Sequence, residues 1–131
     1  MKLSQRVDRH AVERVDELWA GPEFPQECSN RTDVRVLTLS DGKGGEVTAE
    51  MLATGGKEGE RRLFDFMACH FDVQDIDEAG HPYELEKKRR EDVVLRVDAA
   101  HHGLGTASCG PKTTEEHALK TEAFEFAILL H

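Results

Sequence analysis

Alternating hydrophobic and polar residues predict that most of this chain is β-structure. The clearest case is Val93–Val97, where Val93, Leu95 and Val97 share one side of the alternation, as in a half-buried strand. In Leu63–His70, apolar residues occupy positions on both sides of the alternation, which is typical of a strand inside a sandwich. Both segments are therefore expected to be strands.

A candidate hairpin lies earlier in the chain. Val34–Leu39 and Val47–Leu52 are rich in β-branched and aliphatic residues, and the turn stretch Ser40–Gly45 separates them. Two strands joined by a Gly-rich turn indicate antiparallel pairing. The last expected strand, Ala123–Leu130, alternates less regularly.

Two helical segments are expected. Leu3, Val7, Ala11, Val15 and Leu18 follow helical spacing, which predicts a helix over about the first dozen residues, ending before Gly21-Pro22. The acidic stretch Asp72–Ala79 is followed by Gly80, which predicts one or two helical turns capped by Asp72. His81-Pro82-Tyr83 would then lead across the surface to the Val93 strand.

The segment Gly21–Asp33 is rich in Pro, Asn, Ser and Gly and predicts a loop. It contains residue types that hydrogen-bond sugar hydroxyls, namely Glu23, Gln26, Glu27, Asn30 and Arg31. The same types satisfy the backbone of a long loop, and we favour that structural role. For Trp19, the only tryptophan, a core anchor is favoured over a sugar platform.

These elements add up to five or six strands and at most one long helix. The expected fold is a mainly β, antiparallel β-sandwich with one or two short helices, forming a single domain over residues 1–131.

Four stretches carry a resemblance to a known family. They are, in chain order, Val15–Trp19, Phe24–Glu27 with Asn30–Arg35, Asp77–Leu85, and Asp98–Pro111, which reads D-A-A-H-H-G-L-G-T-A-S-C-G-P. Together they resemble the C-terminal half of the small-chain domain of β-galactosidases in glycoside hydrolase family 2. This resemblance implies extended chain at Val15–Trp19 and part of a galactose-mutarotase-like supersandwich.

The resemblance also implies a non-catalytic role. In that family the catalytic carboxylates belong to a separate barrel, and a loop matching Gly105–Pro111 completes its active site from outside. The implied substrate-binding residues are His102, Gly105, Ser108 and Cys109, and no catalytic residue is implied. The position of Cys109 carries Cys or Trp in the family. A stacking platform for sugar is therefore missing in this chain.

Composition narrows the function classes. The net charge of −9 argues against nucleic acid as a partner, and no apolar run approaches the ~20 residues of a membrane span. The basic run Lys87–Arg90 is bracketed by acidic residues and is interpreted as a solvated turn. Three cysteines without a C-x-x-C pair favour reduced thiols and a cytoplasmic chain.

The seven histidines raise the question of a metal site. On an extended chain, adjacent His101 and His102 point to opposite faces and cannot easily share one ion. No Cys or His pair has zinc-finger spacing. We expect no metal and no cofactor. A nucleophile built from Cys109 with His101 or His102 is the alternative chemistry, but the sequence shows no residue to orient it.

Two functions follow from these observations. The first is a non-catalytic domain or subunit of a β-galactosidase that binds a β-galactoside or other sugar and completes the pocket of a catalytic barrel. The alternative is a free-standing carbohydrate-binding or protein-interaction module without hydrolase activity. The missing half of the resembled domain predicts uncovered sheet edges. The expected partner is therefore a barrel-bearing chain or a second copy in a homodimer.

Overall fold

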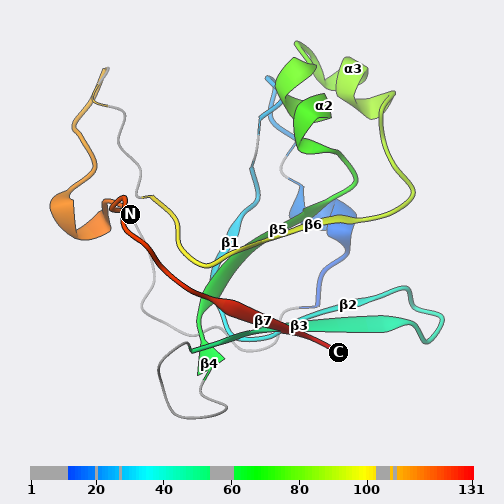
Figure 1. Cartoon of the computed structure of the whole chain (residues 1–131). Coiled ribbons are helices and arrows are strands. Elements are labelled where there is room, and N and C mark those ends of the chain that lie inside the picture. The colour runs from blue at the N-terminus through cyan, green and yellow to red at the C-terminus, as the bar shows by residue number, and fades with distance from the viewer. Residues whose placement is uncertain (1–11, 20, 27, 54–60, 103–106, 108) are drawn as a thin grey trace. The chain divides into compact units, whose positions relative to one another are not determined.

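The computed structural model describes residues 12–19, 21–26, 28–53, 61–102, 107 and 109–131. Their elements follow the chain in the order α1 (Val15–Leu18), β1 (Arg31–Val34), β2 (Leu37–Ser40), β3 (Glu46–Leu52), β4 (Arg61–Arg62), β5 (Phe64–Cys69), α2 (Val73–Glu78), α3 (Pro82–Glu86), β6 (Val94–Asp98), the short 3₁₀ turn η1 (Glu115–His117) and β7 (Ala127–Leu130) (Figure 1).

The strands described here form two sheets. One has the order β1-β5-β6, and in the other β3 pairs with β2, β4 and β7. Both sheets are antiparallel, and the helices are short. This confirms the predicted mainly β, antiparallel fold class.

The contacts within the chain group its residues into two compact units. Of the described residues, unit 1 comprises 33–53, 61–65, 98–102, 107 and 109–131, and unit 2 comprises 12–19, 21–26, 28–32 and 66–97. Within unit 2, Figure 1 shows α2 and α3 next to each other. No helix in the described part of the chain is long and apolar enough to cross a membrane.

The predicted hairpin is present in unit 1. β2 and β3 pair antiparallel, from Leu37 opposite Ala49 to Ser40 opposite Glu46. Oδ1 of Asp41 accepts the backbone N–H groups of Lys43 (2.7 Å) and Gly45 (2.9 Å) across the turn. The hydrogen bond from Lys43 contributes most to lowering the pKa of the Asp41 carboxyl. The turn is therefore held by its own aspartate.

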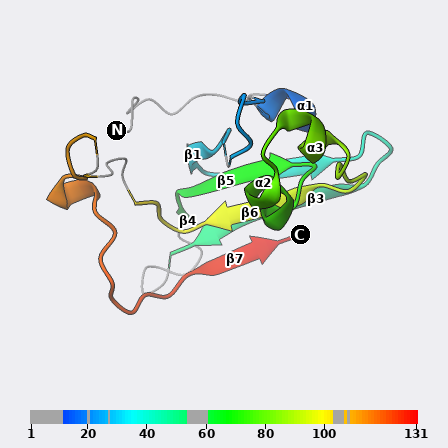
Figure 2. The same ribbon diagram turned by 90° about the horizontal axis from the view of Figure 1, so that it is seen from above.

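The other edge of β3 pairs with the C-terminal strand. β7 runs antiparallel to β3, with Ala49 opposite Leu130 and Leu52 opposite Ala127, and the two strands lie side by side in Figure 2. The expected strand Ala123–Leu130 is too long, because only its second half pairs with β3. Residues 121–126 form no regular element.

The expected strand Val34–Leu39 is also wrong, because the structure divides it between two sheets. β1 ends at Val34 and β2 begins at Leu37, with a bend at Arg35 between them. Just before the break, Asp33 has a φ of 60°. This left-handed conformation is uncommon outside glycine and is best tolerated by Asn and Asp.

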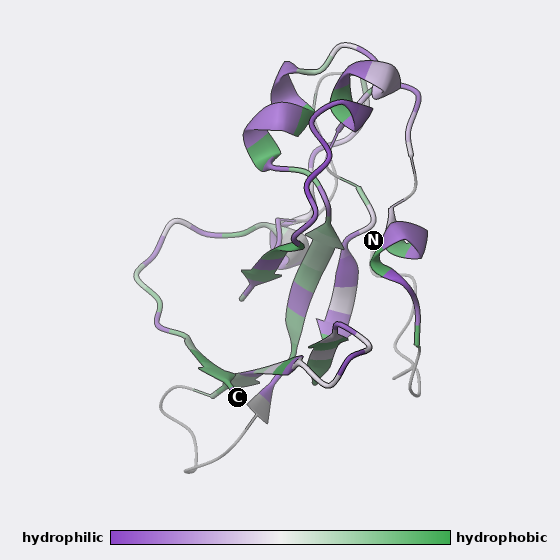
Figure 3. Ribbon diagram, turned by 90° about the vertical axis from the view of Figure 1, so that its right-hand side faces the viewer, coloured by the Kyte–Doolittle hydropathy of each residue, from purple (hydrophilic) through white to green (hydrophobic). Residues whose placement is uncertain are grey.

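Unit 2 has a hydrophobic cluster of its own. Its buried members are Met67, Cys69, Phe71, Ile76, Ala79 and Leu85. Trp19 is half-buried against the cluster, with its ring centroid 5.3 Å from that of Phe71. This is the anchoring position expected for Trp19. In Figure 3, the ribbons of α2 and α3 are coloured for both hydrophilic and hydrophobic residues.

The helices of unit 2 both confirm and correct the predictions. α2 has Asp72 as its N-cap, with Oδ1 accepting the N–H of Gln74, as expected. Val15–Leu18 is helical, so the extended chain implied there is wrong. The predicted N-terminal helix lies almost entirely outside the described residues.

The predicted surface connection at His81–Tyr83 is wrong, because α3 begins there. Pro82 occupies the first turn, where its missing N–H costs nothing. Oε2 of Glu84 accepts the N–H groups of Gly80 (2.9 Å) and His81 (3.1 Å). Two otherwise unpaired donors at the helix start are therefore satisfied.

The basic run Lys87–Arg90 is exposed, yet each of its side chains contacts a group in unit 2. Nζ of Lys88 lies 3.0 Å from both Asp75 and Glu78. Arg89 pairs with Asp16, and Arg90 pairs with Asp92 at 2.8 Å. Lys87 lies over the Tyr83 ring. The run thus acts within the chain rather than as a free basic patch.

Candidate functional site

The centre of the candidate site is a carboxylate buried in a hydrophobic strand. All six residues of β5 are buried, and Asp65 among them is 5% exposed. A carboxylate in such surroundings is unfavourable by several kcal/mol unless hydrogen bonds or an opposite charge compensate it. Its partners therefore decide what it does.

Both oxygens of Asp65 have a partner in unit 1. Oδ1 accepts the backbone N–H of Asp33 at 2.9 Å. Oδ2 lies 2.9 Å from Nδ1 of His101. Because an ionised carboxylate can only accept, the His101 Nδ1–H donates this bond. Asp65 thus joins the left-handed turn at Asp33 to the segment that follows β6.

A second carboxylate approaches His101 from its other side. Oδ2 of Asp98 lies 3.6 Å from Nε2 of His101. This oxygen is buried and accepts no hydrogen bond from the described residues. We call Asp33, Asp65, Asp98 and His101 the aspartate–histidine cluster. It places one imidazole between two carboxylates, with about two-fifths of the imidazole side chain exposed.

His102 is oriented by a different partner. Its Nδ1 accepts the backbone N–H of Leu119 at 3.0 Å. A nitrogen that accepts a hydrogen bond carries no proton, so the proton of this exposed ring lies on Nε2. The Nε2–H of His102 can therefore donate a hydrogen bond to a group outside the chain.

The two histidines have separate partners, Asp65 for His101 and the backbone of Leu119 for His102. Among the residues that the structure describes, no group of three or more His, Cys, Asp or Glu side chains could hold a metal. Both ring nitrogens of His101 face carboxylates, which disfavours His101 as the base for Cys109.

Of the remaining predicted site residues, only Cys109 can be placed. Its side chain is exposed. Gly105 and Ser108 lie outside the described residues. The structure thus gives positions for His102 and Cys109. It also adds Asp65 and Asp98. No local pattern links Asp65 in β5 to His101, whereas Asp98 stands three residues before His101 in the same quoted stretch and was overlooked.

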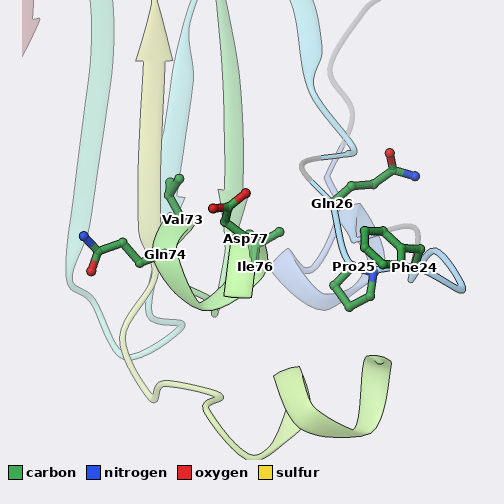
Figure 4. Close-up of a pocket in the computed structure, with 7 residues that line it drawn as sticks. All are labelled: Phe24, Pro25, Gln26, Val73, Gln74, Ile76 and Asp77. Atoms are coloured by element: carbon green, nitrogen blue, oxygen red, sulfur yellow. The ribbon is translucent and has the colours of Figure 1, made fainter. Parts of the chain in front are cut away.

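A separate pocket of about 340 Å³ lies in unit 2, lined by Phe24, Pro25, Gln26, Val73, Gln74, Ile76 and Asp77 (Figure 4). Phe24 is 65% exposed. In the close-up, Ile76 points toward Phe24 and Pro25, whereas the amide of Gln74 points away from them. The polar side chains do not converge on the pocket, and we assign it no ligand.

This chain is similar to parts of known β-galactosidases. The family model described as beta galactosidase small chain matches residues 1–130. A β-galactosidase of Kluyveromyces lactis is 29% identical over 125 residues, which cover 95% of this chain and 11% of that protein. An Arthrobacter β-galactosidase is 34% identical over 111 residues, covering 83% and 10%. The chain spans about a tenth of the length of these curated relatives.

Proposed function

Since this chain belongs to the beta galactosidase small chain family, we propose that it is a non-catalytic domain or subunit that completes the substrate pocket of a glycoside hydrolase barrel. The observation that carries the proposal is the family match over residues 1–130, combined with relatives about ten times longer. A segment of this size leaves room in such proteins for a separate catalytic domain. The substrate class is β-galactosides, including lactose.

The proposed sugar contacts are His102 and Cys109, with Gly105 and Ser108 in the same segment. The Nε2–H of His102 supplies a donor for a sugar hydroxyl oxygen. Cys109 is exposed but offers no aromatic face. We therefore expect weak contact with the sugar and no hydrolysis by this chain alone.

The test of the proposal measures lactose hydrolysis by three samples. They are the chain alone, the Arthrobacter β-galactosidase without the segment matched by this chain, and the two mixed. The proposal expects activity only in the mixture. Turnover by the chain alone that disappears when one of its own carboxylates is changed would contradict a non-catalytic role. A mixture no more active than the truncated enzyme would contradict pocket completion.

Sugar contact at Cys109 is tested by Cys109→Trp. An indole at this exposed position should strengthen binding of a β-galactoside by about 1 kcal/mol through stacking, roughly a fivefold lower Kd. Cys109→Ala is the matched control, because it removes the thiol without adding a ring. Calorimetry that finds equal affinity for both variants, alone and in the mixture, would remove this segment from the sugar site.

A partner chain is the other part of the proposal. Among the described strands, β7 pairs with β3 alone, and Leu130 (61% exposed) and Phe124 (67% exposed) lie on or just before it. An edge strand beside exposed apolar side chains favours pairing with a barrel-bearing chain or a second copy. Sedimentation at micromolar concentration distinguishes a homodimer or a complex with a barrel-bearing chain from a monomer. A chain that stays monomeric, alone and in the mixture, would contradict the proposed partner.

The proposed location is the cytoplasm. The three cysteines, all within the described residues, remain thiols, which is expected of a reducing compartment.

A further inference from the structure

We propose that Asp65 is the positioning residue for His102 and Cys109, and that it acts through His101. The inference rests on the proposed function, because it concerns how the chain presents its sugar contacts. It assigns the aspartate–histidine cluster a role other than catalysis or metal binding.

The carboxylate that binds His101 is itself held in place. Asp65 lies in β5, where every residue is buried, so its carboxylate has little freedom to move. Its bond to the N–H of Asp33 occupies Oδ1 and fixes the plane of the carboxylate. Oδ2 is then presented in one direction, toward Nδ1 of His101 at 2.9 Å.

His101 transmits this restraint to its neighbour in the chain. His101 is adjacent to His102, and consecutive Cα atoms are about 3.8 Å apart. Holding the His101 ring against Asp65 therefore restrains the backbone of His102. The ring of His102 has a separate partner, because its Nδ1 accepts the backbone N–H of Leu119.

A hydrogen bond joins His102 to a residue much later in the chain. The bond between His102 and Leu119 joins residues 17 positions apart, and Cys109 lies between them in sequence. His101 thus binds the carboxylate of Asp65 in β5, and His102 binds the backbone of Leu119. Both anchors depend on specific ring protonation, with the proton of His101 on Nδ1 and that of His102 on Nε2.

The charge of Asp65 has a specific consequence for His101. The variant Asp65→Asn keeps an oxygen for the N–H of Asp33 but places an NH₂ donor toward His101. Nδ1 of His101 must then accept, which moves its proton to Nε2, facing Oδ2 of Asp98. The substitution therefore reverses one tautomer and leaves the His102 tautomer as it was. General destabilisation would not produce this signature.

The first experiment records two-bond ¹H–¹⁵N spectra of the full chain. Wild type should show Nδ1–H for His101 and Nε2–H for His102, and Asp65→Asn should show Nε2–H for both. The amide signals of Cys109 and Gly110 should shift in this variant. The matched control is His131→Gln, which alters a different histidine–carboxylate contact, at Glu50, and should leave these signals unchanged.

A second variant keeps the test valid if Asp65→Asn fails to fold. His101→Gln changes a partly exposed ring and loses the imidazole while retaining a donor. It should also shift the amide signals of Cys109 and Gly110. Nε2–H on His101 in wild type, or unchanged Cys109 and Gly110 signals in folded variants, would overturn the inference.

The second experiment uses the mixture with the truncated Arthrobacter enzyme. His101→Gln should raise KM for lactose about fivefold, the effect of one weakened hydrogen bond, with kcat changed less than about twofold. A variant that only loses assembled enzyme would lower the maximal rate at unchanged KM, and that result would overturn positioning. If the wild-type mixture is inactive, the proposed function fails, and the spectra alone decide the inference.

Discussion

The cluster in unit 2 allows a stability prediction for Phe71. Its side chain is 1% exposed, its ring lies 5.3 Å from that of Trp19, and the guanidinium of Arg89 lies 5.9 Å from its ring centroid. Removing a fully buried Phe side chain costs about 3–5 kcal/mol through lost burial and a residual cavity. Because both aromatic contacts are lost as well, we expect Phe71→Ala to reduce the free energy of unfolding by about 4 kcal/mol.

Trp19 makes this prediction directly measurable. It is the only tryptophan and packs on the same cluster, so its fluorescence during urea unfolding reports on unit 2. With a slope of about 2 kcal/mol per M urea, the loss corresponds to a midpoint lower by about 2 M. A domain with a total stability of about 5–15 kcal/mol would lose a large part of it.

The control is Phe24→Ala in the same unit. It removes the same atoms from a side chain that is 65% exposed, and it should cost less than about 1 kcal/mol. If the two variants lost equal stability, or if Phe71→Ala lost less than 1 kcal/mol, the cluster around Phe71 would not be the core of unit 2.

Three further predictions follow from other contacts. In the native chain, a thiol reagent should modify exposed Cys109 quickly and Cys69, which is 1% exposed, only on unfolding; equal rates would contradict the fold. The hydrogen bond from Arg89 lowers the pKa of the Asp16 carboxyl, so its stabilisation is present above about pH 4 and is lost as pH falls further. Urea unfolding at pH 7 and pH 3 should show a smaller pH dependence for Asp16→Asn than for wild type. Gly44 has a φ of 108°, where an alanine is strained, so Gly44→Ala should cost about 1 kcal/mol and lower Tm by about 4 °C. An unchanged Tm would contradict this backbone conformation.

Elements defined by local pattern could be predicted from the sequence. The hairpin needed only two apolar runs and a glycine-rich turn, and α2 needed only Asp72 and the acidic stretch after it. The signal for α3 was also local, because Pro82 and Glu84 have the spacing of a helix start. The resemblance at His81–Tyr83 gave no helix boundary, and the signal was missed.

Features that depend on distant residues could not be predicted. The break after Val34 follows from a backbone conformation at Asp33 that is tied to Asp65, 32 positions later. The length of β7 is set by the part of β3 with which it pairs. Likewise, the histidine pair was recognisable in sequence, but its link to Asp65 was not, because Asp65 is 36 positions away. Asp98 lies only three positions before His101, so its signal was local and was missed.

The pairing of β3 with a near neighbour on one side and a distant strand on the other sets an order of folding. The β2–β3 hairpin closes over a few residues and can form within about 1–10 μs. The contact between Glu50 and His131 closes a separation of 81 positions, which is slower because a large loop must be ordered first. We therefore expect the hairpin to form during refolding before β7 pairs with the other edge of β3. At high protein concentration, a β7 strand from another copy can occupy that edge first, which makes strand exchange the expected misfolding route of this chain.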